Sequence, residues 1–368
     1  MQRRTFLMGS AGVSLASAWA QTAPVPTAVI GVGNRGYHLL LGVLEEPQAK
    51  VAALCDIKPD RLDKAATAAA KQEAKTYTEW RQIIERKDIQ AVFIATPPHL
   101  HAEMAIAAIR AGKHVYCEKP LGVTASQVRE LWKAGRSAKV VFVTGQQLRS
   151  MTTYIEAVRK IHDGALGELL WIKAQRHASA DLPHDGSSAD WYFDVNKSGG
   201  YLIEQSVHNL DLCNWIVGAH PVKAAGFGAT ARYKNDPPGR TIFDCGTLSF
   251  EYPNGIKMSF TQNVFHPRGM PGANQYVYVY GSKGAVDLMA GNLFYPLGRE
   301  GKPEPFVEKR QEAPHAHVSA FYRAILEGGS NPADLKVGVT AALTSILGHE
   351  AMVRQAVVKW DDLGVDVS

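Results

Sequence analysis

Two short segments combine acidic and basic side chains at spacings that suit acid–base chemistry. In the first, Glu118 and Lys119 end a short apolar run and are followed by Pro120, which favours an extended backbone at Lys119. In the second, Glu204 and His208 are four positions apart, so a helix would place both on one face. A lysine ammonium beside a neutral imidazole can hold a hydroxyl group, take its proton and stabilise the oxyanion. Each segment also has a simpler interpretation: a charged pair at a strand end, and a core histidine bonded by Glu204.

A glycine-rich turn upstream of both segments is typical of nucleotide binding. It spans residues 31–36, follows an apolar run and opens a helical pattern, so backbone can approach a diphosphate closely. Asp56 ends the next apolar run, where a carboxylate can accept hydrogen bonds from the ribose hydroxyls of NAD. Asp56 would repel a 2′-phosphate and therefore favours NAD, although Lys58 leaves NADP open. The cofactor-binding residues predicted here are Gly31, Gly33, Asn34, Arg35, Gly36 and Asp56.

A turn stiffened by two prolines follows the apolar run at 91–95. Its residues stand at the carboxyl end of a predicted strand, which is where open parallel sheets bind their ligands. Thr96, Pro97 and His101 are therefore predicted to contact the cofactor. His101 is equally well placed to begin the following helix.

Residues 24–148 alternate between strand and helix patterns. This alternation predicts an α/β Rossmann domain, a parallel sheet with helices on both faces that binds a dinucleotide. The predicted strands are 27–31, 51–55, 91–95, 114–117 and 140–144, and the predicted helices are 37–44, 59–71, 78–86, 101–111 and 125–137.

Residues 149–368 show a different order of elements, with consecutive strands joined by short turns. This pattern predicts a C-terminal α+β domain with a large, mostly antiparallel sheet. The predicted strands are 169–175, 222–228, 247–252, 256–263, 276–281 and 285–289, and the predicted helices are 154–161, 203–216, 318–326 and 337–356. Residues 177–198 are expected to form a polar, aromatic loop.

The composition is that of a folded protein of two domains. The chain has 368 residues, of which 46% are hydrophobic and 20% charged, and this excludes wholesale disorder. A formal net charge of +5 is too small to indicate a nucleic-acid partner. The four cysteines have no CxxC spacing, so they are expected to be free thiols, and no metal site is expected.

The first residues have the features of an export signal. Arg3 and Arg4 precede a mildly apolar stretch and a small-residue cleavage pattern that ends at Ala20. Residues 1–20 are therefore predicted to be a twin-arginine signal peptide, and the protein to be periplasmic or otherwise exported. The apolar stretch is too short and too polar to span a membrane, so no membrane insertion is expected.

The three N-terminal motifs occur in an order and spacing that resembles the glucose–fructose oxidoreductase/inositol dehydrogenase/rhizopine-catabolism (Gfo/Idh/MocA) family. The resemblance continues in Ser198-Gly199-Gly200-Tyr201-Leu202-Ile203-Glu204-Gln205-Ser206-Val207-His208-Asn209-Leu210-Asp211 and so spans essentially the whole chain after residue 20. It implies a Rossmann domain followed by a domain with an open-faced sheet. A homodimer or homotetramer is expected, because an uncovered apolar face is costly in water. Many members carry Asp where this chain has Glu204.

The resemblance implies an NAD(P)-dependent oxidoreductase that oxidises a secondary hydroxyl of a sugar or cyclitol by hydride transfer. The expected catalytic residues are Lys119, His208 and Glu204. His208 would accept the hydroxyl proton, and Lys119 would stabilise the developing charge on the oxygen. Glu118 would anchor the turn on the cofactor side, where Lys119 also lies. Export after folding suits a tightly bound cofactor.

The substrate is expected to contact residues near the start of the second domain. Polar and aromatic groups that suit a sugar cluster there, among them Arg176, His177, His184 and Asp190. The residues predicted to contact the substrate are Arg149, Trp191, Tyr192 and Asp194. Two other functions remain open. One is an NAD-dependent glycosidase or lyase that oxidises, eliminates and re-reduces, and the other is a non-catalytic sugar-binding protein.

Overall fold

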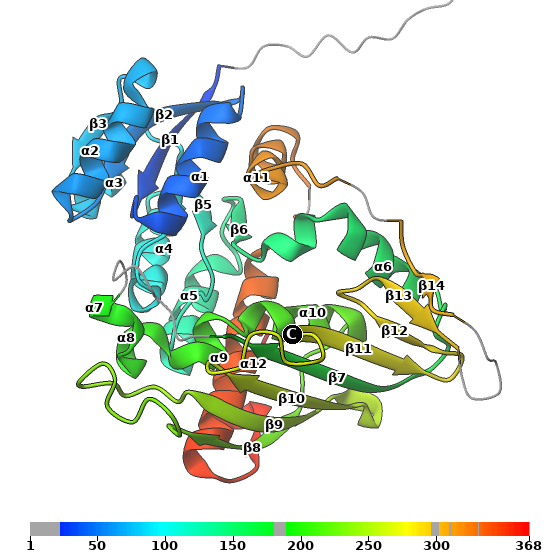
Figure 1. The fold of residues 1–368 in the computed structure, drawn as a ribbon. Helices are drawn as coiled ribbons and strands as arrows, with labels where there is room; N and C mark the ends of the chain where they lie inside the picture. Colours follow the sequence, from blue (N-terminus) through cyan, green and yellow to red (C-terminus); the bar gives the residue numbers. More distant parts are fainter. Residues whose placement is uncertain (1–22, 180–188, 296–301, 309–310, 330, 368) are drawn as a thin grey trace, which may run out of the picture.

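The computed structural model describes residues 23–179, 189–295, 302–308, 311–329 and 331–367. The predicted signal peptide, residues 1–20, lies outside the described residues and stays a prediction. Within the described ranges, no helix is long and apolar enough to cross a membrane. Figure 1 shows two lobes, a blue and cyan one around the first sheet and a green and yellow one around the second.

Six parallel strands form the first sheet, in the order β3-β2-β1-β4-β5-β6, as the predicted Rossmann domain requires. The strands are β1 (Val25–Ile30), β2 (Ala49–Cys55), β3 (Lys75–Tyr77), β4 (Ala91–Ile94), β5 (His114–Cys117) and β6 (Phe142–Thr144). The helices between them are α1 (Asn34–Glu45), α2 (Pro59–Ala68), α3 (Trp80–Glu85), α4 (His101–Arg110) and α5 (Ala125–Gly135). The sequence pattern does not predict β3, because this short edge strand is mostly exposed and carries no apolar run.

The central strands are apolar on both faces because helices cover both faces. Every residue of β4 is buried. Phe93 of β4 and Tyr116 of β5 stack with ring centroids 4.8 Å apart, and Phe321 packs edge-on against Phe93. This rigid centre holds the carboxyl ends of β1, β4 and β5 side by side, so the glycine turn, the Thr96 turn and Lys119 emerge at one edge.

Nine strands form the second sheet, in the order β14-β13-β12-β11-β7-β10-β9-β8-β15. They are β7 (Leu169–His177), β8 (Lys223–Ala229), β9 (Cys245–Glu251), β10 (Lys257–Asn263), β11 (Gln275–Gly281), β12 (Ala285–Asp287), β13 (Asn292–Phe294), β14 (Glu304–Pro305) and β15 (Val358–Lys359). Neighbours are antiparallel except β7 and β10. The predicted mostly antiparallel sheet is therefore confirmed.

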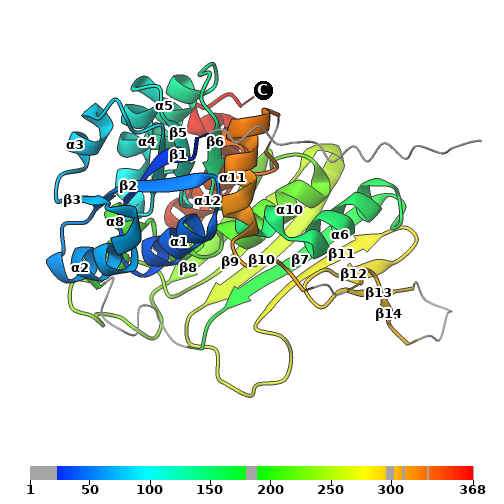
Figure 2. The same cartoon turned by 90° about the horizontal axis from the view of Figure 1, so that it is seen from above.

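Helices cover one face of this sheet, as Figure 2 shows. They are α6 (Thr152–His162), α10 (Val207–Val217) and α12 (Leu335–Arg354). Every second residue of β9 and β10 is buried beneath them. On the opposite face the register aligns Trp171 with Phe294 across β11 and β12, and Trp171, Phe227 and Phe294 are exposed.

Two helices near the end of the chain return to the first domain. The buried side chains of α11 (Ala316–Glu327) join the core of the first sheet, where the Tyr322 hydroxyl lies 2.8 Å from Oγ1 of Thr27. α12 contacts α5 and β6 on one side and α10 and β8 on the other. The prediction that residues 149–368 form a separate domain is therefore wrong for α11. An amphipathic pattern does not tell which core its apolar face covers.

The predicted helix at 203–216 is two helices. α9 (Gly200–Glu204) ends before Gln205, and α10 begins at Val207. The prediction that Glu204 and His208 share one continuous helical face is therefore wrong. Two further short helices, α7 (Ala189–Tyr192) and α8 (Val195–Ser198), lie in the segment predicted as a loop.

Candidate active site

A cavity of about 1110 Å³ opens at the carboxyl edge of the first sheet and extends to β7, α9 and α10. It brings together segments from both domains that are distant in sequence. Of the predicted site residues, it is lined by Gly31, Gly33, Asn34, Arg35, Asp56, Thr96, Pro97, His101, Glu118, Lys119, Trp191, Tyr192, Glu204 and His208.

The glycine turn leaves no room for side chains where the sequence predicts a diphosphate. Gly31 has φ of +82°, and a Cβ there would lie 2.7 Å from the carbonyl oxygen of Ala95. Gly33 is the residue before α1, so the unpaired N–H groups of the helix start face the cavity side of the turn. These features fit a dinucleotide diphosphate.

Asp56 ties the glycine turn to the end of β2. Its Oδ2 accepts from the Val32 N–H at 2.9 Å, and its Oδ1 accepts from the Lys58 N–H at 2.9 Å. Each carboxylate oxygen has further lone-pair capacity, so Asp56 can also accept from ribose hydroxyls. Lys58 Nζ lies 3.2 Å from Asp190 of α7, so its charge is already paired. A lysine paired in this way is less available to bind the 2′-phosphate of NADP, so NAD is favoured further.

His101 joins two turns. Only 1% of it is exposed, and its Nδ1 and Nε2 each lie 2.7 Å from a backbone carbonyl, of Pro120 and Thr96 respectively. His101 lines the cavity, but both ring nitrogens lie within hydrogen-bond distance of these carbonyls, so its contact with the cofactor stays a prediction. Its role is to hold the Thr96 turn and the Lys119 turn at a fixed separation.

Glu118 anchors the Lys119 turn from beneath. Its buried carboxylate accepts from Arg35 Nε at 2.7 Å and from the backbone N–H of Lys119 at 3.2 Å. Burial opposes ionisation, but the charges of Arg35 and Lys119 keep the pKa of Glu118 below its ordinary value. Glu118 thus connects α1 with the turn.

The Lys119 ammonium points into the cavity and contacts Glu204. Nζ donates to the Glu204 backbone carbonyl at 2.6 Å and to its Oε1 at 2.9 Å. Both side chains are nearly buried, with 13% and 11% exposed. An ammonium carries three N–H donors, so one remains for a ligand oxygen. Glu204 orients Lys119 and does not bond His208, which removes the interpretation of His208 as a core histidine held by Glu204.

His208 faces the same cavity from the start of α10. Its Nδ1 lies 2.9 Å from Gln146 Oε1, an acceptor, so Nδ1 carries the hydrogen and Nε2 is an acceptor. Within the described residues Nε2 has no hydrogen-bond partner. Burial, together with the charges of Lys119 and Arg176, holds the pKa of His208 well below its usual range. A neutral imidazole of this kind is ready to accept a proton.

Two family models match the chain in succession. Residues 25–146 match the oxidoreductase family with an NAD-binding Rossmann fold, and residues 154–287 match the GFO/IDH/MocA C-terminal domain. The chain belongs to the Gfo/Idh/MocA family of oxidoreductases. Its first domain is an NAD-binding Rossmann domain, as the glycine turn and Asp56 predict.

Named relatives of this Gfo/Idh/MocA protein act on sugars. A glycosyl hydrolase family 109 protein of Stenotrophomonas maltophilia is 34% identical over 50% of this chain and 43% of its own length. Levoglucosan dehydrogenase of Pseudarthrobacter phenanthrenivorans is 31% identical over 57% of each chain. The chain thus spans about half the length of each of these two relatives. A levoglucosan dehydrogenase in complex with NADH has the same fold: the TM-score is 0.76 at 23% identity, over 91% of this chain and 99% of the other.

Two residues predicted to contact the substrate lie elsewhere in this Gfo/Idh/MocA chain. Arg149 pairs with Asp211 through Nε and Nη2 at 2.8 and 2.9 Å and lines a different cavity, beside α10 and α12. Asp194 caps α8 by accepting from the Asn196 N–H at 2.9 Å and does not line the cleft. The structure therefore places Arg149 and Asp194 outside the cleft that holds the other predicted residues, and each has a protein partner of its own.

The sequence motifs do not predict several residues that line the cavity. They are Gln147, Leu148, Gln205, Asn209, Gln275 and Met289, together with Gln146 behind His208. Gln205 and Asn209 are close to His208 in sequence, so their proximity to the motif could have predicted their place in the site. Gln275 and Gln146 belong to β11 and to the segment after β6, and only the fold brings these to the site.

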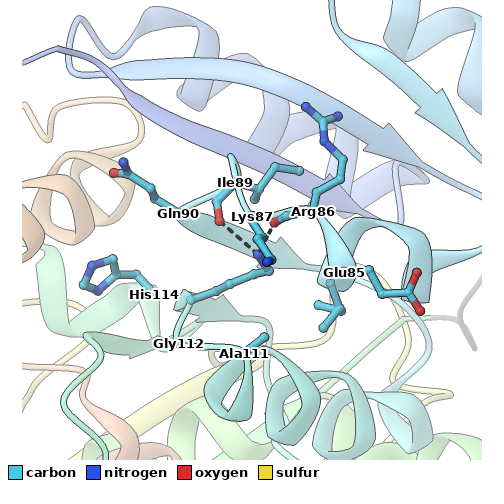
Figure 3. A pocket seen from close by; sticks show the side chains of 10 residues that line it. Glu85, Arg86, Lys87, Ile89, Gln90, Ala111, Gly112 and His114 are labelled. Atoms are coloured by element: carbon cyan, nitrogen blue, oxygen red, sulfur yellow. Dashed lines mark hydrogen bonds between the residues drawn. The ribbon is translucent and has the colours of Figure 1, made fainter.

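A smaller cavity of about 400 Å³ lies at the opposite edge of the first sheet (Figure 3). Its residues precede β4 and β5, whereas open α/β sheets bind ligands at the carboxyl ends. The buried Lys113 ammonium donates there to the carbonyls of Arg86 and Ile89 at 2.6 and 2.9 Å. This cavity is a structural feature of the Rossmann domain and contains no acid–base pair like that of Lys119 and His208.

The Gly36→Ala variant should lose NAD affinity and stability together. A Cβ at position 36 would lie 1.8 Å from the carbonyl oxygen of Gly31, so the turn must move. We expect NAD affinity to fall about 10-fold or more, a cost of about 1.4 kcal/mol, and unfolding free energy to fall by about 1–3 kcal/mol. Calorimetry and urea titration measure the two.

Gly33→Ala is the matched control within the same turn. A Cβ at position 33 would meet the side chain of Arg61, with Nη1 at 2.9 Å as the nearest atom, and this flexible side chain can move. Its unfolding free energy should stay close to that of the wild type. Equal losses of stability in the two variants would contradict the packing argument for Gly36.

Proposed function

We propose that this chain is an NAD-dependent dehydrogenase that oxidises a secondary hydroxyl group of a sugar or cyclitol. The observation that carries the proposal is the meeting of two groups in one cavity: a lysine ammonium with an N–H left for a ligand and a neutral imidazole with an unoccupied Nε2. The glycine turn and Asp56, which fit the cofactor, open into the same cavity.

The proposed chemistry assigns one task to each side chain. NAD, when bound, supplies the hydride acceptor for the carbon that is oxidised. His208 Nε2 accepts the hydroxyl proton, while the third N–H of Lys119 bonds the same oxygen and stabilises its negative charge. Glu204 holds Lys119 in position, and Gln146 fixes the histidine tautomer, so neither reacts directly. The carbonyl product keeps its oxygen beside Lys119.

The test is spectroscopic and uses the purified protein with NAD. Adding pyranoses, cyclitols and anhydrosugars one at a time should raise the absorbance of reduced nicotinamide for at least one of them. No reduction with any of these, although NAD and a sugar both bind, would contradict a dehydrogenase. That outcome would favour the non-catalytic sugar-binding protein.

A redox-neutral glycosidase is the second candidate. The match that favours it is the one with the glycosyl hydrolase family 109 protein, at 34% identity. Oxidation, elimination of the aglycone and re-reduction use the same lysine and histidine, followed by loss of a leaving group. Release of nitrophenol from nitrophenyl glycosides, without a lasting change in reduced nicotinamide, would favour this candidate over the dehydrogenase.

We also propose that the protein is exported by the twin-arginine route with its cofactor tightly bound. Arg3 and Arg4 support the route. The ion pair of Lys58 with Asp190 supports retention, because it connects the end of β2 with α7 across the cofactor side of the cavity. Retention predicts that NAD remains with the protein through gel filtration. Fractionation of producing cells tests the export.

The uncovered face of the second sheet is proposed as the contact between subunits. Trp171, Phe227 and Phe294 are 40%, 66% and 43% exposed there, and large apolar side chains on one sheet face favour association. Light scattering should then give a mass of two or four chains. Phe227→Glu should lower that mass.

A further inference from the structure

Arg176 reaches the cavity from the floor of the cleft. It lies near the end of β7. Its side chain is on the same face of the strand as those of Ile172 and Ala174, which are buried against the helices. Lys173, by contrast, is exposed on the open face of the same strand. Arg176 is therefore the cation that β7 presents to the site.

The partners of this guanidinium are neutral amides. Its Nη1 donates to Asn209 Oδ1 at 3.2 Å and to Gln275 Oε1 at 3.0 Å, and its Nη2 donates to Gln205 Oε1 at 2.9 Å. Its Nε is buried without a hydrogen-bond partner. Three of five N–H donors are thus used, all on groups that carry no charge.

The other cations around the reacting centre are matched by carboxylates. Arg35 pairs with Glu118 at 2.7 Å and Lys119 with Glu204 at 2.9 Å. Among the described residues, Arg176 has no carboxylate partner. Gln205 stands between it and Glu204, because the Gln205 amide accepts from Arg176 and donates to Glu204. Counted over the described residues, Lys119, Glu204 and Arg176 leave one positive charge in excess at this end of the cavity.

Arg176 is half-buried, so its charge loses part of its hydration without a carboxylate to offset the loss, and this favours an anion that arrives with the ligand. The excess is a single charge. A carboxylate supplies one negative charge and two oxygens for a guanidinium, whereas a phosphate monoester brings about −1.5 to −2. The charge count therefore favours a carboxylate.

We infer that Arg176 binds a carboxylate of the substrate, so that the sugar handled at Lys119 and His208 is a sugar acid. The statement about the reaction rests on the proposed dehydrogenase function, whereas the statement about binding does not. Gln205 and Asn209 lie on either side of His208 in the chain and bond Arg176, so an acid held there is adjacent to the base. The carboxylate would orient the ring and select which hydroxyl reaches His208.

The experiment compares methyl hexuronides with the matching neutral methyl hexosides, in the gluco, galacto and manno series. Calorimetry on the protein loaded with NAD gives Kd, and nicotinamide absorbance gives kcat/KM. At least one hexuronide should bind about 10-fold or more tighter than its hexoside. Arg176→Gln should raise the Kd of that hexuronide about 10- to 100-fold, the range of a charge-assisted hydrogen bond.

Lys173→Gln is the matched control, because it removes the same charge from the same strand but on the open face. It should leave the preference for the acid unchanged. Arg176→Lys, which keeps the charge but loses the planar fork, should recover part of the affinity.

Three outcomes would overturn the inference: no acid preferred in any series, tighter binding of glucose 6-phosphate than of every hexuronide, or a preference that survives Arg176→Gln. Tight, Arg176-dependent binding of an acid without reduction of NAD would keep the inference and refute the dehydrogenase. Reduction of NAD by neutral sugars alone would support the dehydrogenase and refute the inference about Arg176.

Discussion

Replacing Lys119 with methionine should lower kcat about 10²-fold or more while NAD still binds. Methionine keeps an unbranched apolar stem that is one atom shorter, and it removes the charge and the N–H donors. The hydroxyl oxygen would then lose the group that stabilises its negative charge. The carboxylate of Glu204, no longer paired, would face the same oxygen and repel that charge.

Because Lys119 and Glu204 form an ion pair, a double variant tests the role of the ammonium more sharply than a single variant does. Glu204→Gln added to Lys119→Met removes the unpaired carboxylate, so the double variant should recover part of the rate lost by Lys119→Met. Lys71→Met is the control, because Lys71 is exposed and lies outside the cavity. Stopped-flow reduction of NAD measures the chemical step in each variant.

A near-normal rate for Lys119→Met would show that the ammonium does not act on the reacting oxygen. A double variant slower than Lys119→Met would instead show that Glu204 has a role of its own. Calorimetry with NAD in each variant separates both results from a loss of cofactor binding.

The sequence predicts the first domain well because local signals and tertiary structure agree there. Apolar runs such as β4 are buried on both faces, and the glycine turn is defined by backbone conformation at Gly31. The position of Lys119 at the sheet edge is also predicted, since the carboxyl ends of parallel strands meet at one edge. Its contact with Glu204 is not, because that contact joins residues 85 positions apart.

The second half of the site depends on long-range contacts that no local pattern contains. The break between Glu204 and Val207 interrupts a stretch whose apolar residues suit a continuous helix. Gln146 reaches His208 from 62 positions away. Arg149 carries the same local signal as a substrate-binding arginine, but Asp211 is its partner. Polar residues near a cleft can be predicted, but their partners cannot.

His208, as the proposed base, should determine both the rate and its dependence on pH. His208→Ala should lower kcat about 10²-fold or more and leave NAD binding close to that of the wild type. The acid limb of the wild-type profile of kcat/KM should lie below the ordinary pKa of histidine. The reason is the direction of the shift: burial and nearby positive charges lower the pKa of His208, so the ring stays neutral and able to accept a proton to lower pH.

The charge of Arg176 also lowers the pKa of His208, so the acid limb should depend on Arg176 as well. Arg176→Gln removes a positive charge that opposes protonation, so the pKa of His208 should rise and the acid limb should move to higher pH. Lys173→Gln should leave the limb in place. An acid limb at or above the ordinary histidine value in the wild type, or an unchanged limb in the residual activity of His208→Ala, would refute His208 as the base. The proton would then go to another acceptor, and Lys119 would be the group to test in its place.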